Sequence, residues 1–186
     1  MTVVDLRALE PAALEQLARV SLPAALEHAP AWLPDLDAAR EEISDALQPG
    51  VIARVLLDPD GAPIGCVAVK HAWDGVWELH PLIIGITHQQ RGHGRRLVRD
   101  IERLAAAQGG LTMTLSTSDT VGATSLSGVD LYDDPIGRLA AIEIRKPHAV
   151  EFWCRIGYRI VGVVPDAEGV GKPCIHLARR LFGAAK

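Results

Sequence analysis

Aromatic residues are scarce in this chain, and neither sign of charge strongly dominates it. Of its 186 residues, 4% are aromatic and 48% are hydrophobic, while 19 lysines and arginines oppose 23 aspartates and glutamates, a net charge of −4. The core must therefore be built mainly from alanine, valine, leucine and isoleucine. Nucleic-acid-binding domains carry a basic excess that this chain lacks, so no nucleic-acid partner is expected. The mild acidity is compatible with a cationic substrate.

Cysteines and long apolar runs are also few. Cys66, Cys154 and Cys174 are an odd number, lie far apart and form no CxxC pair, which predicts reduced thiols rather than a disulfide framework or a zinc site. Acidic residues interrupt the N-terminal stretch, which does not resemble a signal peptide. No apolar run approaches the roughly 18 residues of a membrane helix. We expect a soluble cytoplasmic protein with no metal and no membrane contact.

The hydrophobic pattern predicts one α+β domain over residues 1–186. The first fifty residues are expected to be helical, and Asp35 is the expected N-cap of a helix over residues 35–47. A helix over residues 95–108 between two strands predicts a βαβ unit with parallel strands. Strands are expected over residues 51–57, 63–71, 76–84, 111–116, 158–164 and 174–179, and further short helices over residues 135–144 and 148–155.

The loop before the helix at residues 95–108 contains two glycines, Gly92 and Gly94. Glycines at this place let successive backbone N–H groups converge at the positive end of a helix, which favours a bound phosphate. Arg91, Arg95 and Arg96 add positive charge. Neither GxGxxG nor GK[ST] is present, so the loop is not a Rossmann fingerprint or a P-loop. A single GxG is a weak signal, and an ordinary turn remains the alternative.

Pro81 lies inside the apolar strand that precedes this loop. Because proline cannot donate a hydrogen bond to a strand ladder, it predicts a β-bulge or a sheet edge. An interrupted strand leaves backbone groups free, and an extended ligand can pair beside it. A phosphate site just beyond such a strand suits a long ligand with a pyrophosphate at one end, which is the shape of coenzyme A.

These segments resemble the GNAT N-acetyltransferase superfamily. Gln89-x-x-Gly92-x-Gly94 is similar to its acetyl-CoA-binding motif, [Q/R]xxGx[G/A]. Three further segments resemble, in the same order, the aminoglycoside 6′-N-acetyltransferases of that superfamily: WELHPL at residues 77–82, TSLSGVDLY at residues 124–132, and PDA with GKP within residues 165–173. The resemblance implies an α+β GNAT fold, with a mixed, mostly antiparallel twisted sheet, a splayed parallel strand pair and helices on both faces.

The same resemblance implies direct acetyl transfer from acetyl-CoA to an amine in a ternary complex. An ammonium must lose a proton before it attacks, and Glu78 matches the general base of the family. His80 follows two residues later on the same strand face, where it would orient Glu78 or shape the pocket. The backbone N–H of Leu82 is the implied oxyanion donor. Without the resemblance, Glu78 and His80 would be read as a surface pair on an edge strand. The implied acetyl-CoA-binding residues are Leu82, Ile83, Ile84, Gln89, Arg91, Gly92, His93, Gly94, Arg95 and Trp153.

An aminoglycoside carries several ammonium groups, which acidic side chains would hold. The implied acceptor-binding residues are Trp32, Asp35, Glu78, Asp119 and Asp130. Two positions depart from the family pattern. Trp153 stands where the family has a tyrosine that protonates the leaving thiolate, and an indole cannot give up a proton as a phenol does. Cys174 stands where the family has an aspartate, a loss that would weaken the binding of a polycation.

Two other functions stay open for this chain. The departures at Trp153 and Cys174 favour acetylation of another amine, such as a polyamine or a small metabolite. The chain could also be a coenzyme-A-binding module without transferase activity. The resemblance further implies a homodimer and a place in antibiotic resistance.

Overall fold

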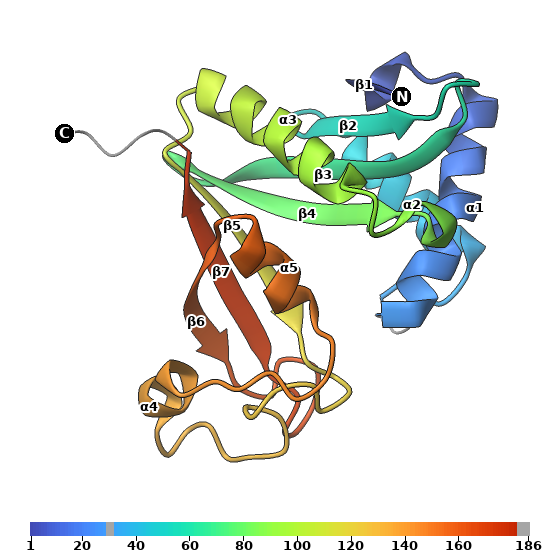
Figure 1. Ribbon diagram of the computed structural model, residues 1–186. Helices are drawn as coiled ribbons and strands as arrows, with labels where there is room; N and C mark the ends of the chain where they lie inside the picture. Colours follow the sequence, from blue (N-terminus) through green and yellow to red (C-terminus); the bar gives the residue numbers. More distant parts are fainter. Residues whose placement is uncertain (29–31, 182–186) are drawn as a thin grey trace. The chain divides into compact units, whose positions relative to one another are not determined.

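The computed structural model describes residues 1–28 and 32–181 (Figure 1). They form two compact units, one made of Met1–Met113 with Leu181 and the other of Thr114–Arg180. Each unit is described here by itself, and a single domain over the whole chain stays a prediction. In the described part of the chain, no helix combines the length and the apolar character that crossing a membrane requires.

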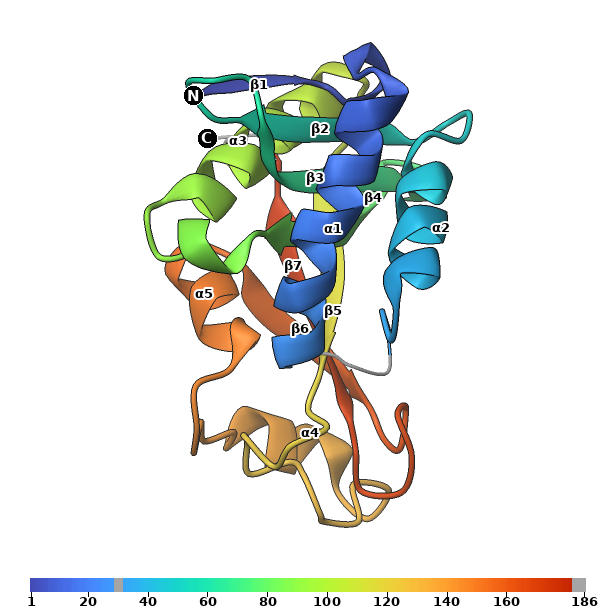
Figure 2. The same cartoon turned by 90° about the vertical axis from the view of Figure 1, so that its right-hand side faces the viewer.

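The first unit is an antiparallel sheet with helices on both faces. Its strands follow the order β1-β2-β3-β4, as neighbouring strands pair in the order of the chain. Helices α1 and α2 pack together on one face, and α3 packs on the other (Figure 2). Its elements are β1 (Thr2–Asp5), η1 (Leu6–Ala8), α1 (Pro11–His28), α2 (Leu36–Ala46), β2 (Ile52–Leu57), β3 (Pro63–Trp73), β4 (Val76–Ile84), η2 (Ile86–His88), α3 (His93–Ala107) and the start of β5 (Thr112–Ser118).

Strand β3 is buried on both faces over residues 63–69. Cys66 and Ala68 belong to the apolar cluster formed with α1 and α2. Val67 and Val69 alternate with them and therefore face α3, since successive side chains of a strand point to opposite faces. Small and β-branched side chains of β3 thus pack against helices on both faces of the sheet. This agrees with the core of alanine, valine, leucine and isoleucine that the scarcity of aromatics predicts.

A β-bulge interrupts β4 at the proline. While β3 advances two residues, from 67 to 69, β4 advances three, from Leu82 to Leu79. The extra residue lies at His80 and Pro81, so both stand opposite a single residue of β3. The bulge that Pro81 predicts is therefore confirmed. Its consequence is that His80 and Pro81 both lie on the face covered by α1 and α2, where they meet residues of α2.

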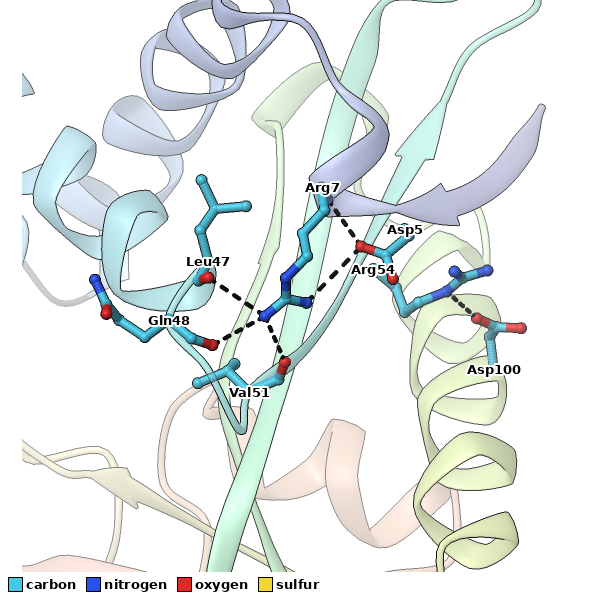
Figure 3. Close-up of polar contacts among 7 residues, drawn as sticks. All are labelled: Asp5, Arg7, Leu47, Gln48, Val51, Arg54 and Asp100. Atoms are coloured by element: carbon cyan, nitrogen blue, oxygen red, sulfur yellow. Dashed lines mark hydrogen bonds and ion pairs between the residues drawn. The ribbon is translucent and has the colours of Figure 1, made fainter.

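The end of α2 is tied to the N-terminal segment by an arginine. One guanidinium nitrogen of Arg7 donates to the carbonyl oxygens of Leu47, Gln48 and Val51 at 3.3, 2.9 and 3.0 Å (Figure 3). These carbonyls lie at and beyond the C-terminus of α2, where the backbone acceptors lack partners within the helix. Arg7 thereby holds α2 in place beside the sheet.

The second unit contains a three-stranded arrangement in the order β5-β7-β6. Strands β6 and β7 are antiparallel, and the Thr114 hydroxyl donates to the Leu177 carbonyl at 3.1 Å across β5 and β7. Helix α5 begins at a capping box in which His148 and Glu151 exchange hydrogen bonds with the backbone. The further elements of this unit are α4 (Pro135–Ala140), α5 (Ala149–Arg155), β6 (Arg159–Val164) and β7 (Cys174–Arg180).

Two expectations about secondary structure are wrong. The first residues are not helical, because Thr2–Asp5 form an edge strand paired with β2. Short β-branched segments of this kind gain their stability from the neighbouring strand, which the local pattern does not reveal. The helix expected over residues 135–144 ends at Ala140, and Ile144 instead forms a bridge with Thr124.

Candidate active site

Glu78 stands on the face of β4 that α1 and α2 cover. Its backbone partner on β3 is Lys70, and cross-strand partners share a face. The Lys70 ammonium lies 3.8 Å from Glu78 Oε2, and the two side chains are 60% and 40% exposed. The Glu78 carboxylate is thus accessible to a solute and already lies near one ammonium group, that of Lys70. An incoming acceptor ammonium could approach the same carboxylate.

His80 belongs to a cluster of three side chains: His80 from β4, Glu42 from α2 and Trp32 from the segment before α2. The Trp32 indole Nε1–H donates to Glu42 Oε2 at 3.0 Å, and His80 Nε2 lies 3.6 Å from Glu42 Oε1. The Trp32 and His80 rings also contact each other, with centroids 4.9 Å apart and planes at 56°. The structure therefore brings together two predicted site residues, Trp32 and His80, through Glu42, which was not predicted.

Glu42 remains ionised within this cluster. Burial of its carboxylate raises its pKa, but the contacts with His80, Trp32 and Lys70 outweigh the burial and lower the pKa below the usual range. The side chain is only 17% exposed, so its negative charge is held in a partly desolvated place. Nothing in the run Arg40-Glu41-Glu42-Ile43 distinguishes this acid from its neighbour, so the sequence carries no signal for it.

A cavity of about 100 Å³ opens beside the C-terminal half of β4. Its walls are Leu82, Ile83, Ile84, Gln89, Trp32 and two alanines of α1, Ala24 and Ala25. Four predicted coenzyme residues and one predicted acceptor residue thus line a single space. Ala24 and Ala25 have small side chains, so the wall formed by α1 leaves this space open.

The loop after β4 has the geometry expected of a phosphate site. The Gln89 amide donates to the Ile84 carbonyl at 3.1 Å, which ties the loop to the strand. Gly92 is the N-cap of α3 with φ 83°, and among the described atoms none lies within 4 Å of where its Cβ would stand. An open approach to the N-terminus of a 15-residue helix fits a pyrophosphate, because the first backbone N–H groups of a helix have no partner within it.

Charged side chains surround this loop. Arg91 and Arg95 are exposed and can approach an anion, while Gly94 lies in the first turn of α3. Burial, followed by the nearby His88 and Arg91, lowers the pKa of His93. His93 is therefore neutral at neutral pH, and the positive charge of the loop comes from its arginines.

The Asp119 carboxylate lies inside the loop that follows β5. It is fully buried in the second unit and accepts from the backbone N–H groups of Ala123 at 2.8 Å and Thr124 at 2.7 Å. It also accepts from the Thr124 hydroxyl at 2.8 Å and from the Val121 N–H at 3.3 Å. With both oxygens engaged inside a loop, Asp119 organises the chain after β5, and its role toward an acceptor stays a prediction.

The remaining predicted residues lie in structural positions as well. Asp35 is confirmed as the N-cap of α2 and accepts from the Ala38 N–H at 2.9 Å. Asp130 is exposed and accepts from the Tyr132 N–H at 2.9 Å. The Trp153 ring is buried in the second unit, where it meets Phe152 and Tyr158 edge to face. Their roles toward acceptor and coenzyme stay predictions.

The described residues contain no group of three or more histidine, cysteine, aspartate or glutamate side chains that could hold a metal ion. The three cysteines are free thiols, and burial raises the pKa of the Cys66 thiol to about 12. Cys66 is therefore protonated and unreactive at neutral pH.

The model of the acetyltransferase (GNAT) family matches residues 12–137. The chain belongs to the GNAT family. The family membership confirms the predicted α+β fold class, an N-acetyltransferase activity and acetyl-CoA as the co-substrate. A search of the curated proteins found no match.

Solved structures of the family resemble the chain over its whole length. An aminoglycoside 6′-N-acetyltransferase complexed with coenzyme A has a TM-score of 0.89 and 29% identity, with all of both chains covered. The aminoglycoside 6′-N-acetyltransferase from Enterococcus faecium has a TM-score of 0.86 and 30% identity, again with all of both chains covered. The ribosomal-protein-S18-alanine N-acetyltransferase from Escherichia coli, at a TM-score of 0.65 and 14% identity over 100% of this chain and 96% of its own, shares the fold.

Proposed function

We propose that this GNAT enzyme acetylates the 6′-amino group of an aminoglycoside by direct attack on acetyl-CoA. The observation that carries the proposal is the joint placement of Glu78, His80 and Trp32 on one face of the first unit, beside the cavity lined by residues 82–84. The likeness to aminoglycoside 6′-N-acetyltransferases over the full length of both chains supports the acceptor class.

Glu78 is the proposed general base. Amines titrate near 10, so at neutral pH a carboxylate must take the proton from the acceptor ammonium, directly or through water. The nitrogen lone pair then attacks the thioester carbonyl carbon. The backbone N–H of Leu82 stabilises the oxygen that becomes negative. The carbon–sulfur bond then breaks, and the nitrogen loses its second proton to water as the neutral amide forms.

The loop after β4 is the proposed site of the pyrophosphate. The backbone N–H groups at the start of α3, opened by Gly92 and Gly94, and the side chains of Gln89, Arg91, His93 and Arg95 surround it. Ile83 and Ile84 continue the wall of the cavity toward this loop and would border the extended arm of the coenzyme. Trp153 stays a predicted coenzyme-binding residue in this proposal but supplies no general acid, because its indole donates no titratable proton. The coenzyme leaves as the thiolate.

A Glu78→Ala variant tests the base. We expect acetyl-CoA binding to be retained and turnover with a kanamycin-type acceptor to fall by about tenfold or more, since a positioned base contributes about 10²–10⁴-fold. Turnover equal to that of the wild type would remove Glu78 from the mechanism. Lys70→Gln is the matched control for turnover at saturating acceptor, because it removes the partner charge and leaves the base in place.

An acceptor panel tests the substrate class by following thiol release from acetyl-CoA. Release with kanamycin- and gentamicin-type compounds that carry a 6′-amino group supports the proposal. Release with polyamines or small metabolites alone supports the alternative amine acceptor. Binding of acetyl-CoA without release with any amine would indicate a binding module and would contradict the acetyltransferase assignment.

We also propose that the protein works as a cytoplasmic homodimer and confers aminoglycoside resistance. The resemblance to the aminoglycoside acetyltransferases is the support for both. Sedimentation equilibrium at micromolar concentration should give twice the mass of the 20.0 kDa chain. Expression in a sensitive bacterium should raise the inhibitory concentration of kanamycin, and the Glu78→Ala variant should not.

A further inference from the structure

Glu42 is a charged side chain that the roles described above do not use. It lies in the middle of α2, on the edge of the helix face that buries Ala39, Ile43 and Ala46. Its neighbour Glu41 is exposed, whereas the Glu42 side chain is 17% exposed. Burying a carboxylate in part is unfavourable unless hydrogen-bond donors compensate it, so the environment of Glu42 needs an explanation.

Each oxygen of the Glu42 carboxylate faces one predicted site residue. Oε2 accepts from the Trp32 indole at 3.0 Å, and Oε1 lies 3.6 Å from His80 Nε2. The two rings also contact each other, so the three side chains restrain one another. Trp32 comes from the segment between α1 and α2, and His80 from the bulge of β4. The Glu42 carboxylate therefore connects Trp32 and His80, which are nearly fifty residues apart in the sequence.

The contact also orients the His80 ring. His80 Nε2 is the ring nitrogen that lies toward the Glu42 carboxylate, at 3.6 Å. His80 stands two residues beyond Glu78 on the same strand face. Glu42 therefore helps to set the orientation of the His80 ring beside the proposed base.

We propose that Glu42 is a positioning residue for acetyl transfer: its carboxylate holds the Trp32 indole and the His80 imidazole in the orientation that receives the amine acceptor. Glu42 acts through these two rings and does not itself touch the reacting atoms. The inference rests on the proposed acceptor site at Glu78. Because catalytic geometry is sensitive to displacements of about 1 Å, loss of the Glu42 contacts with Trp32 and His80 should reduce acceptor turnover strongly.

Glu42→Gln is the principal variant, since it keeps the size of the side chain and removes its charge. We expect kcat/KM for a kanamycin-type acceptor to fall by about tenfold or more, while the KM for acetyl-CoA stays within about twofold. Glu41→Gln is the matched control, an exposed acid one residue away on the same helix, and it should behave as the wild type. Circular dichroism and thermal unfolding confirm that each variant is folded.

Double-mutant cycles distinguish positioning from a general structural role. Trp32→Phe removes the indole donor but keeps an aromatic ring, and His80→Asn removes the imidazole. If Glu42 acts through these rings, Glu42→Gln should lower kcat/KM by less than about twofold in the combined Trp32→Phe, His80→Asn background. An undiminished effect in that background would overturn the inference. If Glu42→Gln does not fold, Glu42→Asp takes its place in the same cycle and is judged by the same criterion, because the shorter side chain withdraws the carboxylate from both rings.

Glu78→Ala is measured in the same series, so that two failures can be told apart. A loss of turnover in Glu78→Ala together with wild-type kinetics in Glu42→Gln would overturn the positioning role and leave the acceptor site intact. Wild-type turnover in both variants would overturn the site at β4 itself, and the positioning role with it. The inference stands if both variants lose acceptor turnover and Glu41→Gln does not.

Discussion

Replacing Asp119 should destabilise the second unit without a specific effect on the acceptor. In Asp119→Ala, the buried N–H groups of Ala123 and Thr124 lose their acceptor, while the Thr124 hydroxyl can rotate. Each buried donor left without a partner costs about 1–3 kcal/mol, so two of them predict a loss of about 2–6 kcal/mol in the free energy of unfolding. Asp119→Asn should lose a comparable amount, because an amide NH₂ would face these donors.

The pH dependence of stability gives an independent measure of the same group. Burial raises the pKa of Asp119, but the hydrogen bonds from Ala123 and Thr124 and the nearby His148 outweigh it and hold the pKa below its ordinary value. A lowered folded-state pKa stabilises the protein above the ordinary aspartate pKa, and this stabilisation is lost as the pH falls through the folded-state value. Asp119→Asn should therefore flatten the acid side of the stability profile.

Urea unfolding followed by circular dichroism, at pH 7 and at steps below pH 5, measures both effects. Asp130→Ala is the matched control, because Asp130 is exposed and accepts one hydrogen bond, from Tyr132. It should cost no more than about 1 kcal/mol. The reasoning is refuted if Asp119→Ala is as stable as Asp130→Ala. A folded Asp119→Ala that only raises the acceptor KM would instead restore the acceptor-binding role predicted from the sequence.

Three further substitutions test the first unit. Arg7→Ala should lower the free energy of unfolding by about 1–3 kcal/mol, measured by urea unfolding, because three carbonyls after α2 lose a charged donor (Figure 3); an unchanged midpoint would contradict this. Gly92→Ala places a side chain on a residue at φ 83°, a left-handed backbone conformation that is unfavourable for alanine, although the Cβ itself meets no atom of the described residues. The strained loop should bind the pyrophosphate less well, so the KM for acetyl-CoA should rise by about fivefold or more while the acceptor KM stays unchanged. Lys70→Met removes a cation 3.8 Å from Glu78, so the KM of a cationic acceptor should fall by up to about fivefold, with the largest effect at low salt; a higher KM would show that Lys70 helps acceptor binding.

Local patterns predicted most elements of this fold because each pattern has a local cause. The Asp35 cap, the apolar stripe of α3 and the turn-bounded strands β2, β3 and β4 all formed where periodicity and capping residues placed them. Pro81 predicted the bulge for the same reason, since its missing N–H interrupts any ladder. The edge strand β1 was missed because its stability comes from β2 and not from its own residues.

The candidate site was predictable in part. Glu78 and His80 could be found because a short, distinctive segment carries them, and the loop from Gln89 to Gly94 because glycines before a helix have a physical purpose. Acids are harder to interpret, since a carboxylate serves equally as a ligand for a cation and as an acceptor for backbone N–H groups. Asp119 shows the difficulty: the family resemblance assigns it to the acceptor, and in the structure its carboxylate accepts from backbone N–H groups inside a loop.

The sequence by itself determined most of the secondary structure of both units, the GNAT motif and, through the family resemblance, the identity of the proposed base. These depend on residues that are neighbours along the chain. Only the tertiary structure decided that Glu42 is an acid beside His80 and Trp32. That choice depends on how α2 packs against the bulge of β4, a contact between segments far apart in sequence, and a carboxylate acquires its role from the donors that folding brings to it.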